Sequence, residues 1–302
     1  MSGVRHENHY LVVADMAQQG YTISEVCRAL SISRTAYYRW LHRSPSARER
    51  ENTTILLRLT QLYQQYRGIY GYRRLGDEYN ARYHTNYNDK RFHRLAKIGR
   101  LRAIIRTKQP APHAAPPVQL PANILARNFA CAHTNEKWLT DITEFQYASG
   151  KKLYLSAILD LKANDIVAYT ISPHNNNNLV FTTFDRAIAK YPDAHPLVHS
   201  DRGFQYTNPK FKIKLRDQGM LQSMSRPGMC IDNAPMEAFW GILKSEMYHL
   251  GQFNDYDTLA QAISDYIHFY NTQRRQRRLD RLPPSAYRRR IEQQEKTNEP
   301  ND

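Results

Sequence analysis

The chain has 302 residues, of which 41% are hydrophobic, and it carries 43 Lys and Arg against 28 Asp and Glu, a net charge of +15. This composition excludes a fibrous or wholly disordered chain, and the length indicates about two domains. No apolar run approaches the roughly 18 residues that span a bilayer, and the N-terminus lacks a signal-peptide pattern, so we expect a cytoplasmic protein without a membrane partner.

The positive charge is concentrated near the N-terminus. Residues 1–106 contain 19 Lys and Arg against 8 Asp and Glu, a net charge of +11, whereas residues 136–250 contain 13 against 12, a net charge of +1. Clustered positive charge is the electrostatic signature of a protein that binds a polyanion. We therefore expect the N-terminal third to bind nucleic acid and the nearly neutral region to carry the chemistry.

Residues 1–46 contain a helix-turn-helix pattern. Thr22 and Glu25 form a capping box that begins a short helix, and a second helix follows the Ser31-Ile32-Ser33 turn. A generic helical hairpin is the alternative, because such patterns are short and common. The start of a second helix reads base edges, which makes four side chains candidates for DNA contact: Arg34, Thr35, Tyr38 and Arg39.

Residues 47–106 predict a second helical, helix-turn-helix-like module. After an amphipathic helix and a Gly-punctuated turn, Asn88 or Asp89 begins a helix with a basic outward face. Such a face is commonly only solvated surface, but beside a first DNA-binding pattern phosphate contact is the stronger interpretation. The candidates on this face are Lys90, Arg91 and Arg94.

Residues 107–134 form the predicted boundary between the DNA-binding modules and the rest of the chain. The run at residues 109–121 is rich in Pro and Ala, a composition that forms no regular element and is typical of a semi-rigid linker.

Residues 135–250 predict an α/β domain. The expected elements are strands at 138–147, 153–161 and 165–171, a helix at 179–191, a strand at 197–199, a helix at 209–218, a strand near Gln222 and a final helix. This order favours a mixed sheet covered by helices. The second strand is a near-continuous apolar run, which is typical of a central strand buried on both faces.

Three acidic residues in this domain are candidate metal ligands. Asp141 lies within the first strand, Asp201 follows a short apolar strand, and Glu237 lies on the last helix. Hard divalent cations prefer oxygen ligands, and two of them can activate a nucleophile and stabilise a leaving oxygen in phosphoryl transfer. For a single Asp, a cap, a turn or a surface charge is the usual role.

Helical spacing places Lys244 on the same face as Glu237, and Phe239, Leu243 and Leu250 on the opposite face. Glu246 then points away from Glu237. We expect Lys244 to contact the DNA that passes the site, the alternative being a surface cation.

Two more residues are candidates for supporting these carboxylates. His199 precedes Asp201 by two positions, so it lies on the same side of an extended strand and can orient groups or carry a proton. A satisfied buried His is an equally good interpretation. Asp160 is either a carboxylate behind the site or a residue of the turn that ends the second strand.

Residues 251–302 predict a C-terminal helix followed by a basic tail. Five arginines fall within eight residues before Pro283: Arg274, Arg275, Arg277, Arg278 and Arg281. This segment is a second candidate for the DNA-recognition surface.

The motifs WLTDIT, HSDRGFQYTN and DNAPMEAFWGILKSE, with 35 residues between Asp201 and Glu237 and a Lys seven residues later, resemble the D-D-E signature of bacterial insertion-sequence transposases. The resemblance is to the second-reading-frame proteins of the "insertion sequence three" family and covers nearly the whole chain. In the family signature, Pro227, Met229 and Ile231 differ from the residues that are commoner at these positions. In the arginine-rich segment, Gln276 stands where the family usually has a His.

This resemblance implies an RNase H-like fold similar to retroviral integrases, with Asp141, Asp201 and Glu237 as catalytic ligands of two Mg²⁺ ions, for which Mn²⁺ can substitute. The implied partners are double-stranded DNA of the element's terminal repeats and of the target, further copies of the chain on that DNA, and an upstream-frame fusion partner. The implied location is the nucleoid.

Two other functions remain open on the sequence. One is an RNase H-like nuclease without strand transfer, against which Lys244 and the N-terminal modules argue. The other is a DNA-binding repressor with an inactive catalytic fold, against which the three retained carboxylates argue.

Overall fold

The computed structural model describes residues 7–104, 123–148, 150–226 and 230–298. The chain forms two compact units, residues 1–104 and 105–302, each described below by itself. The predicted linker at residues 109–121 lies outside the described residues, as do Pro227 and Met229. None of the described helices is long and apolar enough to cross a membrane.

The first three helices form the predicted helix-turn-helix with one helix added in front. They are α1 (Glu7–Gln18), α2 (Ile23–Ala29) and α3 (Arg34–Leu41), and α1 was not expected from the sequence. The Thr22–Glu25 capping box begins α2, and the Ser33 hydroxyl accepts from the backbone N–H of Ala36 to begin α3. A small shared core includes Val13, Val26 and Tyr37.

The second module is a three-helix unit, formed by α4 (Ala47–Gln65), α5 (Tyr72–Arg82) and α6 (Asp89–Ile98). Asn88 is the N-cap of α6, one of the two caps expected. The helices pack closely at Gly76, where an added Cβ would lie 2.4 Å from the ring of Phe92. Phe92 and Leu95 are buried, so the outer side of α6 keeps its basic residues near solvent.

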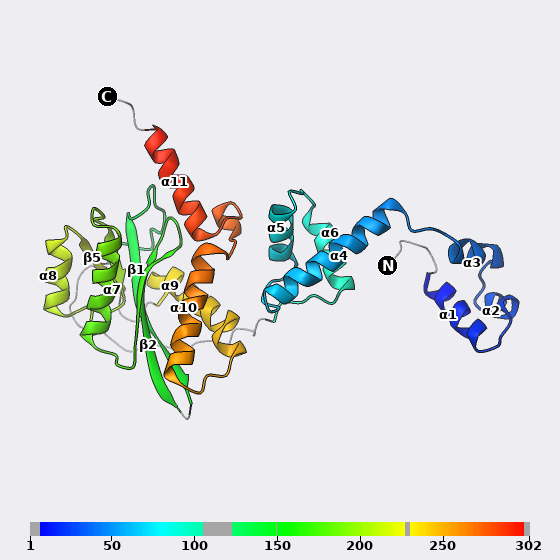
Figure 1. Cartoon of the computed structure of the whole chain (residues 1–302). Helices are drawn as coiled ribbons and strands as arrows, with labels where there is room; N and C mark the ends of the chain where they lie inside the picture. The colour runs from blue at the N-terminus through cyan, green and yellow to red at the C-terminus, as the bar shows by residue number, and fades with distance from the viewer. Residues whose placement is uncertain (1–6, 105–122, 149, 227–229, 299–302) are drawn as a thin grey trace. The chain divides into compact units, whose positions relative to one another are not determined.

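The second unit is built on a five-stranded mixed sheet of order β3-β2-β1-β4-β5 (Figure 1). Its strands are β1 (Lys137–Tyr147), β2 (Lys151–Asp160), β3 (Ile166–Ser172), β4 (Leu197–Ser200) and β5 (Leu221–Met224). The first three strands pair antiparallel, whereas β4 pairs parallel to both β1 and β5. The predicted order of strands and helices is therefore confirmed.

Helices cover both faces of the sheet. Phe184 of α7 (Asn177–Lys190) and Phe211 of α8 (Pro209–Asp217) share an apolar cluster with Trp138 of β1. Helices α9 (Ala234–Glu246) and α10 (Tyr256–Thr272) pack on the other face, in a cluster that contains Leu139. Neighbouring residues of β1 thus face opposite layers, as strand geometry requires, and β2 is buried on both faces as predicted.

The C-terminal helices belong to the same compact unit as the sheet, on both sides of the predicted boundary at residue 250. Apolar residues of α10, among them Leu259 and Ile263, lie in the core cluster with α9. Leu250 was expected on the apolar face of α9, but that helix ends at Glu246 and Leu250 lies exposed in a 3-10 turn, Tyr248–Leu250.

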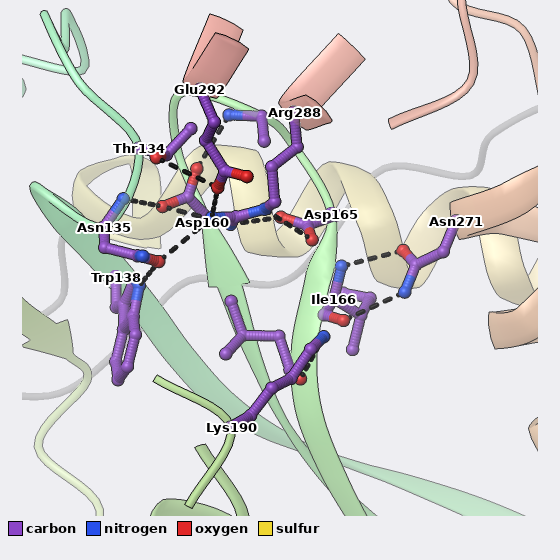
Figure 2. A network of polar contacts seen from close by, with 12 residues as sticks. Thr134, Asn135, Trp138, Asp160, Asp165, Ile166, Lys190, Asn271, Arg288 and Glu292 are labelled. Atoms are coloured by element: carbon purple, nitrogen blue, oxygen red, sulfur yellow. Dashed lines mark hydrogen bonds and ion pairs between the residues drawn. The ribbon is translucent and has the colours of Figure 1, made fainter. Parts of the chain in front are cut away.

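The last helix, α11 (Pro284–Asn298), forms a buried ion pair with a residue next to the sheet. Figure 2 shows Arg288 reaching from this helix to the turn after β2, where its guanidinium donates to both oxygens of Asp165 at 2.7 and 3.0 Å. It also donates to Asn135 at 3.1 Å and lies 3.5 Å from Asp160. The basic tail is therefore partly an internal structural element.

Candidate active site

Asp141 lies in the middle of β1, opposite Ala157 of β2. Its two oxygens are held separately: the indole N–H of Trp240 donates to Oδ2 at 2.9 Å, and the backbone N–H of Ile142 donates to Oδ1 at 2.8 Å. Burial, with the charges of Asp201 and Glu237 adding to it, raises the pKa of Asp141 to about 7. The carboxylate is oriented by its neighbours, and its pKa stays raised although the charge of Lys244 interacts with it.

Asp201 follows the end of β4, and the strand pairing places it beside Asp141. Leu139 pairs with His199 in the parallel register of β1 and β4, each aspartate lies two residues further along its segment, and the charge of Asp201 acts on Asp141. The backbone N–H of Gly203 donates to Asp201 Oδ1 at 2.9 Å. A Cβ at Gly203 would lie only 3.1 Å from that oxygen, so the tight turn favours glycine.

For both Asp141 and Asp201, the ionised form of the carboxyl group is disfavoured by desolvation. The Asp201 side chain reaches solvent, yet partial desolvation by the surrounding chain raises its pKa despite the bond from Gly203. The charge of Asp201 also opposes the ionisation of Asp141, as neighbouring carboxylates do. This pair is therefore a site where added positive charge would be stabilising.

Glu237 is exposed in the first turn of α9. The helix is anchored on β1 from two points, because Trp240 binds Asp141 and the side-chain amide of Asn233 donates to the carbonyl oxygen of Thr140 at 3.3 Å. These contacts hold the helix that carries Glu237 against the strand that carries Asp141, and the charge of Glu237 contributes to the raised pKa of Asp141.

The three carboxylates have the ligand chemistry for a hard divalent cation, since oxygen donors are what Mg²⁺ prefers. Within the described part of the chain, no three His, Cys, Asp or Glu side chains are gathered closely enough to hold a metal ion as they stand. The aspartate pair fits a cation best, and Glu237, exposed on its helix, is the third donor that would complete the set.

Lys244 lies on α9 two turns beyond Glu237, with its ammonium group 5.3 Å from the centre of the Phe145 ring. Burial lowers its pKa, while the negative charges of Asp141 and Glu144 oppose that effect. Glu246 points away from this face, as expected: it is buried and accepts two bonds from Arg274 and one from Tyr266. Because Arg274 is buried in this ion pair, it is not part of the surface that the basic tail could present to DNA.

His199 and Asp160 both have other partners than the carboxylate pair. The ring nitrogens of His199 lie 2.9 and 3.1 Å from the hydroxyls of Ser223 and Ser225, and burial lowers its pKa to about 4. This is the satisfied buried His that the sequence left open. Asp160 accepts from the backbone N–H of Ala163 at 2.7 Å, a bond across the turn that ends β2, in line with the interpretation of Asp160 as a turn residue.

Three contributors to the site were missed from the sequence. Trp240 binds Asp141, but its position in an apolar helix gives only a core signal. The buried hydroxyl of Tyr206 lies 3.2 Å from Thr140 Oγ1, and desolvation raises its pKa, with Asp141 and Asp201 adding to that shift. Asp232 directly precedes Asn233, the N-cap residue of α9, and accepts from two arginines, Arg226 and Arg127.

The candidate DNA contacts of the first unit divide into exposed and engaged side chains. All four on α3 are exposed: Arg34, Thr35, Tyr38 and Arg39. On α6, Lys90 and Arg94 are also exposed. Arg91 is not available in the same way, because its guanidinium donates to Glu51 at 2.6 Å and to Asn52 at 2.8 Å. That ion pair removes Arg91 from the proposed contact surface.

Family comparisons divide the chain along similar lines. A model described as an integrase core domain matches residues 132–230, and another with the same description matches residues 237–291. An HTH-like domain model matches residues 49–109, and a homeodomain-like domain model matches residues 11–52.

Several proteins are similar over most of the chain. InsK of Escherichia coli K12, named as a transposase of insertion sequence element IS150, is 36% identical over 91% of this chain and 96% of InsK. A 31 kDa protein of insertion element IS600 from Shigella sonnei is 34% identical over 89% of this chain and 99% of that protein. Among solved structures, the HTLV-2 integrase catalytic core domain in complex with magnesium matches at 17% identity and a TM-score of 0.43, covering 52% of this chain and 98% of that one.

Proposed function

The chain belongs to the insertion-sequence transposases that have an integrase core and helix-turn-helix domains, and from this premise we propose that Asp141, Asp201 and Glu237 are the carboxylates at which it cleaves and joins DNA strands. The observation that supports the proposal is the parallel register of β1 and β4, which runs to Leu139 and His199, two residues before the two aspartates, together with the effect of the Asp201 charge on Asp141. Helix α9, attached to Asp141 through Trp240, then brings Glu237 to the same region.

Each residue has a distinct part in this proposal. Trp240 and Ile142 each donate to one oxygen of Asp141, and Gly203 donates to one oxygen of Asp201, so the protein fixes the orientation of both aspartates. Integrase-like cores generally use a divalent metal, and two Mg²⁺ ions, or Mn²⁺ in their place, would supply the charge that activates the attacking hydroxyl and stabilises the leaving oxygen. The chain would supply only ligands and positioning, without a covalent protein intermediate.

The test is to incubate the full chain with Mg²⁺ and duplex DNA carrying the terminal sequences of its own element, and to map every new strand junction. Ends joined to other DNA support strand transfer. Cleaved ends without any joined product identify a nuclease, and specific binding without cleavage identifies an inactive repressor.

An insertion sequence has two ends, and each must be engaged at a catalytic site before the element can move. This requirement supports a homo-oligomer on DNA, in which separate copies hold separate ends. A protein–DNA complex whose mass contains a single copy of the chain while both ends are joined to target DNA would exclude that arrangement.

Lys244 is expected to hold the DNA end near the cleaved bond. Replacing it with Met keeps the apolar stem beside Phe145 but removes the charge, so end cleavage should slow roughly tenfold, the effect of losing one charge-assisted phosphate contact. Lys212→Met, on the exposed side of α8, is the matched control. A normal rate of end cleavage in the Lys244 variant would contradict this role.

Recognition and non-specific affinity are expected to separate between two exposed arginines. Arg34→Ala on α3 should reduce the preference for element ends over random DNA, because a recognition helix reads bases. Arg94→Ala on α6 should weaken both affinities about equally and reduce the salt slope by roughly one, as a phosphate contact does. Binding measured with both DNAs across a salt series tests this, and an unchanged preference in the Arg34 variant would place recognition elsewhere.

A further inference from the structure

A cluster of positive side chains surrounds one buried carboxylate just before α9. Asp232, whose side chain is 0% exposed, accepts from the backbone N–H, Nε and Nη2 of Arg226, from Nε of Arg127 and from the amide of Asn123, at 2.7–3.1 Å. These bonds hold the pKa of Asp232 well below its usual range, with Arg226 the largest cause. The carboxylate of Asp232 thus fixes the positions of two guanidinium groups, those of Arg226 and Arg127.

The exposure of this cluster differs from that of the other buried ion pairs. Arg274 and Glu246 are 2% and 3% exposed, so both charges are enclosed and the pair is structural. In contrast, Arg226 and Arg127 are 49% and 41% exposed around a fully buried acid. Asp232 therefore fixes the two guanidinium groups while leaving part of each at the surface.

The cluster lies beside the proposed active site. Strands β4 and β5 are parallel, with Ser200 paired to Met224, and the backbone N–H of Ser225 donates to the carbonyl of Ser200 at 2.9 Å. Asp201 follows Ser200 and Arg226 follows Ser225, so both residues leave the sheet at the C-terminal ends of these two parallel strands. Arg202 follows Asp201 and donates through Nε to the carbonyl of Ser225 at 2.7 Å, which adds a third arginine at this edge.

The backbone that presents Arg127 is itself constrained. Ala126 and Arg127 both have left-handed φ values, 45° and 63°, which are unfavourable for residues with a Cβ. Two bonds hold this segment in place: Ala126 N–H donates to Asn123 Oδ1 at 2.9 Å, and Leu125 N–H donates to the Ser223 hydroxyl at 3.0 Å. The fold thus maintains a strained turn that brings Arg127 to Asp232.

We propose that Arg127, Arg202 and Arg226, a set we term the arginine rim, bind the phosphodiester backbone of the DNA strand that enters the carboxylate site. A guanidinium offers a planar fork of donors that matches phosphate oxygens, and Asp232 pre-orients two such forks. The rim also supplies positive charge at the edge where three carboxylates would otherwise repel DNA. This inference rests on the proposed function, since it takes the carboxylates as the site of strand chemistry.

The test measures binding without divalent metal, so it does not depend on catalysis. The full chain is titrated, across a salt series, with a branched duplex that joins an element end to a target duplex. Arg226→Gln should weaken binding roughly tenfold or more and lower the salt slope by about one. Arg226→Lys should retain part of the slope, and Arg216→Gln, an exposed arginine in a surface pair on α8, should change neither.

Single methylphosphonates then identify the phosphate that is bound. Replacing one phosphate near the junction should weaken binding to the wild-type chain but cost the Arg226 variant little, because the contact is already absent. If the methylphosphonate that has this effect lies on the element-end strand, the arginine rim binds the element end, and if it lies on the target strand, the rim binds the target DNA. Unchanged salt slopes in both Arg226→Gln and Arg127→Gln would overturn the proposal. It would also be overturned if, at every methylphosphonate position, the loss of affinity caused by the DNA change simply added to the loss caused by the arginine variant. Arg127→Gln, whose loss leaves Arg226 on Asp232, keeps the test valid if Arg226→Gln does not fold.

Discussion

Asp141→Asn, Asp201→Asn and Glu237→Gln are each expected to abolish both end cleavage and strand joining, with residual activity at least a thousandfold lower. Each change removes an anionic oxygen from the proposed site while keeping the size of the side chain, and a site that would hold two divalent cations depends on that charge. Single-turnover assays with labelled end DNA and Mg²⁺ measure both steps. Activity in any of the three variants comparable with that of the wild type would remove that residue from the site.

The same variants should remain folded. In the metal-free protein, burial and the neighbouring charge of Asp201 raise the pKa of Asp141, so ionised Asp141 is unfavourable and its replacement by Asn relieves that cost. A carboxyl with a raised folded-state pKa lowers stability as the pH rises through that range. We therefore expect Asp141→Asn to unfold at a denaturant concentration no lower than the wild type at pH 8. Asp217→Asn, an exposed carboxylate on α8, is the control for activity and stability.

Arg288→Met is expected to lower the free energy of unfolding of the 105–302 unit by about 3–5 kcal/mol, the usual cost of removing one partner from a buried ion pair. Arg288 is 5% exposed and donates twice to Asp165, which is itself buried, while Asp160 lies 3.5 Å away (Figure 2). The variant leaves both carboxylates without the guanidinium. Arg289→Met, an exposed neighbour on the same helix, should have little effect.

This loss should depend on pH in a defined direction. Burial already raises the pKa of Asp160 to about 6, although Arg288 opposes that shift, so removing Arg288 raises it further. At low pH the Asp160 carboxyl can take up a proton, which removes its charge, whereas at high pH it stays charged without its partner. The deficit of Arg288→Met relative to wild type should therefore be larger at pH 8 than at pH 5.5.

Urea unfolding followed by tryptophan fluorescence at both pH values measures this difference. The double variant Asp165→Asn/Arg288→Met should recover part of the lost stability, since one stranded charge is gone. A deficit for Arg288→Met no larger than that of Arg289→Met would show that α11 is not held by this network.

The order of the helices and strands could be predicted from local patterns in the sequence. Apolar spacing and caps such as the Thr22–Glu25 box act within a few residues, so they specify local structure without knowledge of the fold. The same locality explains why the strand and helix order of the catalytic unit was predicted closely. It also explains the correct face of Glu246, because positions on one helix are related by a fixed rotation.

Tertiary structure alone decided which charges face solvent and which are used internally. Arg274, Arg288 and Arg91 are as basic as Arg34 in the sequence, yet each is bound to acidic or amide groups far along the chain, at Glu246, Asp165 and Asn52. Asp232 and His199 acquired partners in the same way. Such contacts join residues separated by tens of positions, and no local pattern records them. The sequence could name the side chains able to act, but only the packing of distant segments decided which of them remain at the surface to do so.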